Sequence, residues 1–387
     1  MTSTIPYGRQ AISEADIESV VQVLRSDFLT QGPKVPTFEA AVARHVGVPH
    51  ALSVNSATSA LHLACLALDL GPGDWLWTSP NSFVASANCA LFCGAQVEFV
   101  DIDPRTYNLC PQALAEKLAV AKRTGRLPKV VVPVHFAGQS CDMHAIATLA
   151  KEYGFKVIED ASHAIGGRWK EKFVGACEHS DITVFSFHPV KIITTAEGGL
   201  LTTRDTRIAQ RLADLRSHGI TRDPVRMERL DQGAWYYEQQ GIGFNFRMTE
   251  LQAALGVSQM TELDHFVARR HELVARYEEG LENLPLVKPW QQPESYSAFH
   301  LYVIQVTDEG PLNRHALFDV LRSSGIQVNV HYIPIHLQPY YKSMGFKSGD
   351  FPNAEAYYDR AISLPLFAGL TESDQDYVIA KLKEFLL

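Results

Sequence analysis

Long apolar runs, a secretion signal and a basic stripe are all missing from this 387-residue sequence. No apolar run approaches the roughly 18 residues that a membrane-spanning helix needs. The first residues, MTSTIPYGRQ, have neither the basic nor the apolar region of a signal peptide. The formal net charge is −8, and acidic and basic residues are interspersed. These absences predict a cytoplasmic protein that binds neither a membrane nor a nucleic acid.

Paired cysteines are missing too. The six cysteines form no CxxC pair, and most lie among apolar neighbours: Cys65, Cys89, Cys93, Cys110, Cys141 and Cys177. This pattern predicts buried thiols in a reducing compartment and no metal site. Neither GxGxxG nor GxxxxGK(S/T) occurs at the strand-to-helix turn near residue 56, so a nucleotide loop of those types is not supported there.

What the sequence does contain is a regular alternation of short apolar runs and amphipathic stretches. After helices predicted at 15–24 and 35–46, the predicted strands are 51–54, 75–78, 97–100, 129–134, 155–159, 182–187 and 199–203. Helices are predicted between them at 59–70, 82–92, 111–121 and 143–153. Strands that alternate with helices of this length predict an α/β fold with a mostly parallel, seven-stranded sheet covered on both faces.

The composition changes after two long helices predicted at 249–255 and 264–284. Residues 285–293 contain three prolines, and strands at 300–306 and 327–331 and helices at 312–323 and 372–385 follow. This order predicts a smaller C-terminal α+β domain. We therefore expect a large domain over residues 1–258 and a small domain over residues 259–387.

A lysine follows the buried strand predicted at 182–187. Pro189 cannot donate to a sheet and ends this strand, and Lys191 comes two residues later. Open α/β sheets bind ligands beyond the carboxyl ends of their strands. A lysine placed there can form a Schiff base with a carbonyl, which pyridoxal phosphate chemistry requires. Taken alone, this stretch favours a solvated loop lysine, because most lysines are solvated.

Other polar residues lie at matching strand and helix ends. Asp160 either caps the next helix or is the carboxylate that keeps the ring nitrogen of a cofactor protonated. Ser186 and the hydroxyl-rich helix start at 55–59 offer hydrogen bonds to a phosphate. His163 and Phe83 are either structural residues or ring-stacking partners. Together with Lys191, this set predicts a pyridoxal phosphate site.

Five stretches together resemble the sugar aminotransferases of the DegT/DnrJ/EryC1/StrS family. They are NSATSALHLA, EDASHAIGG, FSFHPVKIITTAEGG, RSHGI and GFNFRMTELQAALG. The resemblance runs from about Pro6 to the C-terminus and implies the fold of aspartate aminotransferase, called fold type I. It also implies pyridoxal 5'-phosphate as cofactor, with Lys191 as its covalent partner and proton shuttle and Asp160 on the pyridine nitrogen.

The same resemblance implies the remaining cofactor contacts. Ser56, Ala57, Thr58 and Ser186 are expected at the phosphate, with Phe83 and His163 on either side of the ring. Asn245, in the motif GFNFRM, is expected to reach the phosphate from the neighbouring subunit, so the resemblance implies a homodimer with a shared active site. Many members have glycine where this chain has Ala57, but a backbone N–H contact tolerates that change.

Within the family, Tyr7 and the stretches DFLTQGP, NSATS, TTAEGG and VHYIPIH resemble the aminotransferase of the pseudaminic acid route. This likeness implies that L-glutamate donates an amino group to a UDP-linked 4-keto-6-deoxy-N-acetylhexosamine. Substrate contacts are then expected at Tyr7, Phe28, Leu29, Thr30, Gln31, Ile333, Pro334, Ile335 and His336. Two alternatives stay open, namely another nucleotide-linked 4-keto or 3-keto sugar and a non-catalytic regulator. Arg9 and Arg247 are candidates for the carboxylate of the donor.

Overall fold

A seven-stranded sheet lies at the centre of the structure, which is a computed structural model that describes residues 4–387. In spatial order its strands are β2 (His50–Val54), β10 (Gly199–Thr203), β9 (Ile182–Ser186), β6 (Lys156–Asp160), β5 (Val130–Val132), β3 (Trp75–Thr78) and β4 (Gln96–Phe99). Only β10 is antiparallel to its neighbours. The predicted α/β class and mostly parallel sheet are confirmed.

Different helices cover the two faces because successive side chains of a strand point to opposite sides. Val130 and Val132 of β5 pack in one cluster with α3 (Ala57–Ala67), α4 (Ala85–Phe92) and α7 (Thr206–Arg216). Val131, between them, packs with α5 (Pro111–Thr124) and α6 (Met143–Tyr153). All three valines are fully buried, as a strand covered on both faces requires. No helix within residues 4–387 is long and apolar enough to span a bilayer.

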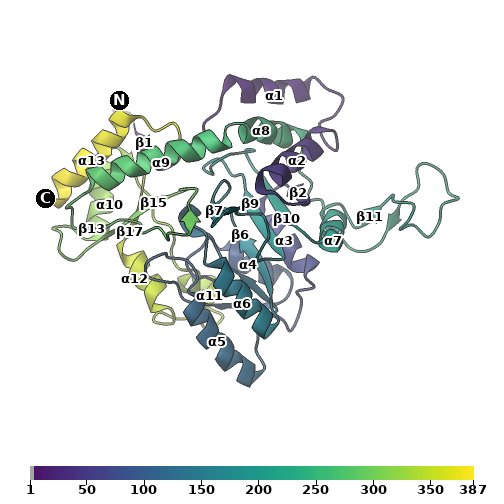
Figure 1. The fold of residues 1–387 in the computed structure, drawn as a ribbon, viewed down its shortest axis with the longest axis horizontal. Coiled ribbons are helices and arrows are strands. Elements are labelled where there is room, and N and C mark those ends of the chain that lie inside the picture. Colours follow the sequence, from purple (N-terminus) through teal and green to yellow (C-terminus); the bar gives the residue numbers. More distant parts are fainter. Residues whose placement is uncertain (1–3) are drawn as a thin grey trace.

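Three helices pack together along one side of the sheet (Figure 1). They are α1 (Glu14–Leu24), α2 (Lys34–Val46) and α8 (Glu250–Met260). Gly256 of α8 faces Phe38 of α2 so closely that a Cβ would lie 2.7 Å from the Phe38 ring. Gln259 Nε2 donates to the buried Asp16 carboxylate at 2.7 Å, which joins α8 to α1. These contacts fix the end of α8, where the chain turns toward its C-terminal part.

A second hydrophobic core lies in the C-terminal part of the chain. It contains a sheet in the order β13 (Leu286–Val287), β15 (Tyr302–Val306) and β17 (Ala361–Leu364), with α9 (Leu263–Gly280), α10 (Arg314–Ser323) and α13 (Glu372–Leu386). Arg270 of α9 is fully buried and donates to the carbonyls of Phe299, His300 and Leu366. Burial lowers the pKa of Arg270 to about 10, and these carbonyls stabilise its charge. The predicted boundary at 258–259 lies in the last turn of α8 and stays a prediction.

The strand predicted at 327–331 is wrong beyond its first residue. β16 spans only Ile326–Gln327, where it pairs with β1 (Ile5–Pro6). Beyond it, the backbone of Asn329 pairs with that of Ser363 in an isolated bridge, and the His331 side chain lies 2.7 Å from the Ser363 hydroxyl. No ladder of paired residues continues. The sequence interpretation does not include α7, β17 or α12 (Pro352–Arg360). The remaining short elements are β7 (Arg168–Trp169), β8 (Lys172–Phe173), β14 (Ser295–Tyr296), α11 (Pro339–Lys342) and two 3-10 turns, η1 (Phe136–Gly138) and η2 (Ile335–Leu337).

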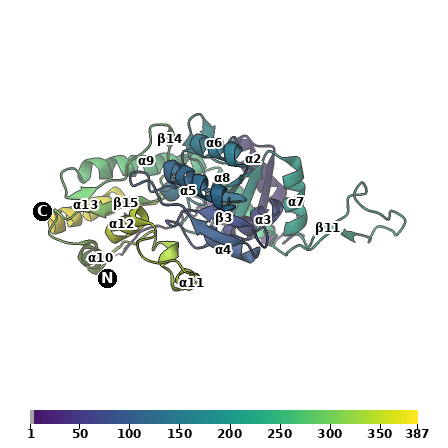
Figure 2. The ribbon, with the colours of Figure 1, turned by 90° about the horizontal axis from the view of Figure 1, so that it is seen from below.

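A narrow arm projects from the body of the molecule beside α7 (Figures 1 and 2). It begins with the antiparallel pair β11 (Ile220–Thr221) and β12 (Glu238–Gln239). Glu238 accepts the backbone N–H groups of Glu228 and Arg229, which holds the loop between the strands together. Large apolar side chains on the arm and at its base are exposed: Val225 (93%), Leu230 (67%), Trp235 (77%) and Ile242 (85%).

Candidate active site

A cavity of about 530 Å³ opens beyond the carboxyl ends of β6 and β9. Parallel strands end at the same sheet edge, so residues far apart in the sequence meet there. The cavity wall includes these residues predicted for the cofactor: Ser56, Ala57, Thr58, Phe83, Asp160, His163, Ser186 and Lys191. Tyr7, predicted for the substrate, also lines it. The structure therefore brings the predicted lysine, carboxylate and hydroxyl groups into one space.

Lys191 is half-buried on the wall, five residues after the last residue of β9. Its backbone N–H donates to the His188 carbonyl at 2.9 Å, which closes a turn across Pro189. Burial lowers the pKa of Lys191 from 10.5 to about 8, and the negative charge of Asp160 opposes that shift. Because a large fraction of such an amine is neutral near pH 8, it can act as a nucleophile and as a base.

Asp160 ends β6 and is only 4% exposed. Its Oδ1 accepts the Ser162 N–H at 3.1 Å and the Ser162 hydroxyl at 2.6 Å. Its Oδ2 accepts the Ser86 hydroxyl at 2.6 Å. A carboxylate has about four acceptor positions, so one position on Oδ2 remains for a donor such as a protonated ring nitrogen.

The first turn of α3 forms an anion cradle. Ser56 caps this helix, and its Oγ accepts the Ser59 N–H at 3.1 Å. Within residues 4–387, the N–H groups of Ala57 and Thr58 make no hydrogen bond, and free N–H groups at a helix start attract phosphate. Gly199 lies directly behind them, since a Cβ there would be 2.5 Å from the Ser56 carbonyl oxygen. Gly199 pairs with Ser186 in the sheet, which puts the serine next to the same turn.

His163 is a neutral hydrogen-bond donor. Its Nδ1 accepts the Ala137 N–H at 3.2 Å, so its proton lies on Nε2, 3.0 Å from the Tyr332 hydroxyl. Burial, helped by the charge of Lys191, lowers the pKa of His163 well below its usual value. Two further buried histidines line the cavity: burial lowers the pKa of His331 to about 3 and that of His300 well below normal. None of these three side chains carries a positive charge at neutral pH.

Other predicted residues lie outside this cavity. Ile335 and His336 are fully buried, and the His336 Nε2 lies 3.0 Å from Glu355 Oε1. Pro334 is buried as well, whereas Ile333 is exposed. Residues 28–31 lie at the surface near the start of α8, where Thr30 and Thr249 form an isolated antiparallel β-bridge. Asn245 is exposed at the base of the arm.

Several lining residues are absent from the sequence interpretation, among them Ser86, His300, His331 and Tyr332. The resemblance places substrate contacts only in the second half of the stretch VHYIPIH, at residues 333–336. A histidine and a tyrosine at the end of the strand predicted over 327–331 were the available signal. For Ser86 the sequence has no comparable signal, because its partner Asp160 is 74 residues away.

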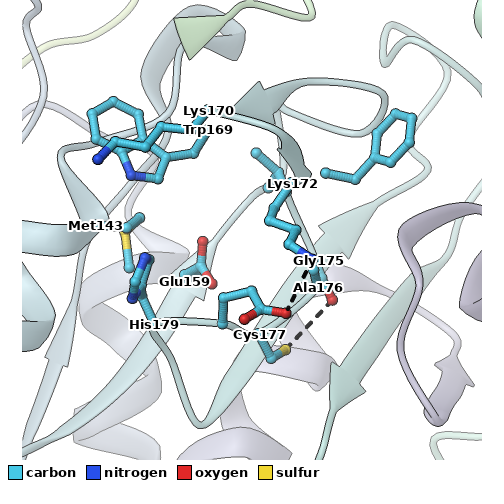
Figure 3. A pocket seen from close by; sticks show the side chains of 12 residues that line it. Met143, Glu159, Trp169, Lys170, Lys172, Gly175, Ala176, Cys177 and His179 are labelled. Carbon is cyan, nitrogen blue, oxygen red and sulfur yellow. Dashed lines mark hydrogen bonds and ion pairs between the residues drawn. The ribbon is translucent and has the colours of Figure 1, made fainter. Parts of the chain in front are cut away.

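A second hollow, of about 240 Å³, lies on the other face of β6 (Figure 3). Glu159 points into it because neighbouring strand residues point to opposite faces. The Glu159 carboxylate is occupied by structural contacts: Oε1 accepts the Thr183 hydroxyl at 2.9 Å and is bonded by Ser180, and Oε2 accepts the His135 Nε2–H at 2.7 Å. Glu159 therefore supports the sheet, and the predicted chemistry lies on the face of Asp160.

The residues present fit pyridoxal phosphate. Lys191 offers an amine, Asp160 an open acceptor position, the α3 turn an anion site and Phe83, 59% exposed at the cavity, a flat ring. A sheet of this topology with this site defines a fold type I, pyridoxal phosphate-dependent aminotransferase. The chain belongs to the DegT/DnrJ/EryC1/StrS aminotransferase family, whose model matches residues 10–383.

Similar proteins agree with this assignment. The spore coat polysaccharide biosynthesis protein SpsC of Bacillus subtilis is 40% identical over 99% of this chain and 97% of its own. The structure of Helicobacter pylori PseC, an aminotransferase involved in pseudoaminic acid biosynthesis, matches with a TM-score of 0.89 and 31% identity over 99% of both chains. The structure of the putative sugar aminotransferase Spr1654 from Streptococcus pneumoniae in its PLP-form matches with a TM-score of 0.88 and 29% identity over 99% of this chain and 100% of that chain.

Replacing Gly199 by alanine should weaken cofactor binding. The added Cβ would push the first turn of α3 away, because it would lie 2.5 Å from the Ser56 carbonyl. Because the turn that would bind the phosphate is displaced, we expect a Kd for the cofactor that is roughly tenfold higher, equivalent to about 1.4 kcal/mol. Titration of the apoenzyme with pyridoxal phosphate measures it. Gly71→Ala, where a Cβ meets nothing within 4 Å, is the control. Equal Kd values for both variants would contradict the cradle.

The covalent capture of pyridoxal phosphate by the apoenzyme should depend on pH through Lys191. Below the lysine pKa the amine is protonated and unreactive, so the capture rate should rise to half its maximum near pH 8. A free lysine would place this midpoint near about 10.4. Stopped-flow absorbance measures the rate. Since Asp160 raises the pKa of Lys191, Asp160→Asn should move the midpoint to lower pH. A midpoint near that of free lysine would rule out the buried amine.

Proposed function

We propose that the protein transfers the amino group of L-glutamate to carbon 4 of UDP-2-acetamido-2,6-dideoxy-β-L-arabino-hex-4-ulose, which yields the 4-amino sugar for pseudaminic acid biosynthesis. The observation that carries the aminotransfer is the Lys191 amine beside Asp160 in one cavity. The likeness to PseC over almost the whole chain supports the substrate. L-Glutamate is the donor that the family resemblance implies.

The chain's own residues account for the proton movements. When bound, pyridoxal phosphate supplies an electron sink that acidifies the hydrogen on the carbon carrying the amino group. Lys191 would hold the cofactor. Once released from it, the Lys191 Nζ would take that proton and would later give it back to complete the transfer. Its pKa of about 8 suits both directions near neutral pH. Asp160 would keep the ring nitrogen protonated, and Ala57, Thr58 and Ser186 would bind the phosphate.

The proposed substrate contacts receive uneven support. Tyr7 lines the cavity, and Phe28, Leu29 and Ile333 are each about half exposed, at 52%, 51% and 46%, so these side chains are available to a ligand. Burial removes Pro334, Ile335 and His336 from direct contact in this conformation. Tyr7 is the best supported of the proposed substrate contacts, because it lines the same cavity as Lys191.

A second candidate is transamination of another nucleotide-linked 4-keto or 3-keto sugar, such as a precursor of perosamine or of an antibiotic sugar. The identity of 40% to SpsC, a protein of spore coat polysaccharide biosynthesis, favours it. The two candidates share the cofactor and the first half of the reaction. They differ only in the sugar that receives the amino group.

The decisive experiment incubates the holoenzyme with L-glutamate and a panel of nucleotide keto sugars. We expect the mass of the 4-amino product with the UDP-linked N-acetyl sugar and little product with the others. Lys191→Ala should lose both the absorbance of the covalently held cofactor and turnover. Production of 2-oxoglutarate with a different sugar would select the second candidate. If glutamate never converts the cofactor, aminotransfer itself would be wrong.

We also propose that two copies share each active site. The arm carries exposed Val225, Leu230 and Trp235, and an exposed apolar cluster of this kind marks a protein interface. Asn245, at the base of the arm, lies outside its own cavity but is exposed toward solvent, where a second copy could meet it. A homodimer would cover the arm and let Asn245 reach the neighbouring phosphate cradle.

Mixed dimers test the shared site. Asn245→Ala alone should weaken cofactor binding, and Lys191→Ala alone should abolish turnover. If the site is shared, a mixed dimer of the two variants contains one intact site. In that site Lys191 comes from the Asn245→Ala chain and Asn245 comes from the Lys191→Ala chain. Mixing the two after mild dissociation should therefore restore activity above that of either variant. Trp235→Ser, analysed by light scattering, should favour monomers. Absence of any gain in a verified mixed dimer would mean that each chain completes its own site.

A further inference from the structure

Two buried serines at the start of α4 join this helix to the Asp160 carboxylate. The Ser86 hydroxyl donates to Asp160 Oδ2 at 2.6 Å, and the Ser82 and Ser86 hydroxyl oxygens lie 2.7 Å apart. Ser82, Ser86 and Asp160 are only 4%, 1% and 4% exposed, and all three line the cavity. The proposed aminotransfer assigns no role to either serine.

The direction of each hydrogen bond in this chain of hydroxyls follows from its chemistry. An ionised carboxylate only accepts, so the single hydroxyl proton of Ser86 is donated to Asp160. The Ser86 oxygen must then accept the bond between the two serines, and Ser82 donates it. The chain therefore runs from Ser82 through Ser86 to Asp160. Hydrogen bonds linked in this way polarise one another, so Ser82 strengthens the bond that Ser86 donates.

The needs of helix α4 alone do not account for Ser86. Ser86 is the second residue of α4, and the residue before the helix is Val84, an apolar side chain that cannot cap it. Serine is less favourable than alanine inside a helix, and both neighbours of Ser86, Ala85 and Ala87, are alanines. A buried hydroxyl is costly unless it is hydrogen-bonded, and the proton of Ser86 goes to Asp160. The carboxylate is therefore the reason for a serine at this position.

The two oxygens of Asp160 have different kinds of partner. Oδ1 accepts both of its bonds from Ser162, which is only two residues further along the same turn. Oδ2 accepts its bond from Ser86 on another element, so this bond fixes the carboxylate relative to α4. The Ser86 N–H also donates to the Phe83 carbonyl at 3.2 Å. The start of α4 therefore holds both Phe83 and Asp160 Oδ2 at the cavity wall.

We propose that Ser86, supported by Ser82, is a positioning residue that sets how strongly Asp160 attracts the proton of the cofactor's ring nitrogen. This inference rests on the proposed function, in which Asp160 binds that nitrogen. A hydrogen bond donated to a carboxylate stabilises its negative charge and weakens its attraction for another proton. Ser86 therefore leaves the proton on the ring nitrogen, where its charge helps the ring to accept electrons. Without Ser86 the proton would move toward Asp160 Oδ2, and proton removal by Lys191 would slow.

Nitrogen-15 NMR of the holoenzyme, loaded with pyridoxal phosphate that is labelled at the ring nitrogen, tests this role directly. Ser86→Thr and Ser86→Val have nearly the same shape and differ in the hydroxyl, so they form a matched pair. We expect the Ser86→Thr resonance to stay near that of the unchanged protein and the Ser86→Val resonance to shift toward that of an unprotonated ring. Ser82→Ala should shift the resonance in the same direction by less, because it removes only the supporting bond. Equal resonance positions for Ser86→Thr and Ser86→Val would overturn the proposal.

Single-turnover conversion of the bound cofactor by L-glutamate separates this role from the proposed function. At saturating glutamate, Ser86→Val should react roughly tenfold more slowly than Ser86→Thr, because one charge-assisted hydrogen bond is lost. The glutamate concentration that gives half the maximal rate should be the same for both variants. If glutamate converts none of the proteins but the nitrogen resonance still follows the Ser86 hydroxyl, aminotransfer would be wrong and the role of Ser86 would stand. An unchanged resonance in variants that glutamate does convert would overturn the role of Ser86 alone.

Discussion

The close contact between Gly199 and the first turn of α3 sets the position of the phosphate cradle relative to Ser186. β10 is the one antiparallel strand of the central sheet, and it runs between β2 and β9. Its first residue lies under the Ser56–Ala57 peptide, with no space for a side chain. The same residue pairs with Ser186, so the phosphate cradle, the serine and the turn to Lys191 are held at fixed separations. A bulkier residue there would disturb all of them together.

Burial determines which groups in the cavity are charged. Three histidines stay neutral because desolvation lowers each pKa, and Lys191 loses part of its charge near pH 8 for the same reason. The Asp160 carboxylate tolerates burial because three hydrogen bonds, donated by Ser162 and Ser86, compensate for its lost hydration. The site thus combines a lysine that can give up its proton with a buried carboxylate that accepts three hydrogen bonds. Transamination needs such a pair.

Local patterns in the sequence predicted the parts of the site that lie at the ends of regular strands. Lys191, Asp160 and Ser186 follow buried apolar runs, and the position of such runs in an α/β sheet fixes where their ends meet. Tyr332 and His331 were missed because they lie in irregular chain whose path depends on Ser363, Tyr357 and Pro80, residues distant in the sequence. The strand predicted over 327–331 had the right composition, but after Gln327 its backbone pairing is reduced to one isolated bridge between Asn329 and Ser363.

The phosphate cradle of one chain is built from few donors, all near the start of α3 and the end of β9. A phosphate monoester has three terminal oxygens that accept several hydrogen bonds. The Ser56 oxygen accepts the Ser59 N–H, which leaves its O–H as a donor, so this chain offers the N–H groups of Ala57 and Thr58 and the hydroxyls of Ser56 and Ser186. An additional donor from outside the chain would complete the set. An exposed Asn245 beside an arm rich in exposed apolar residues is well suited to supply it, so the same surface that would join two copies would also complete their sites.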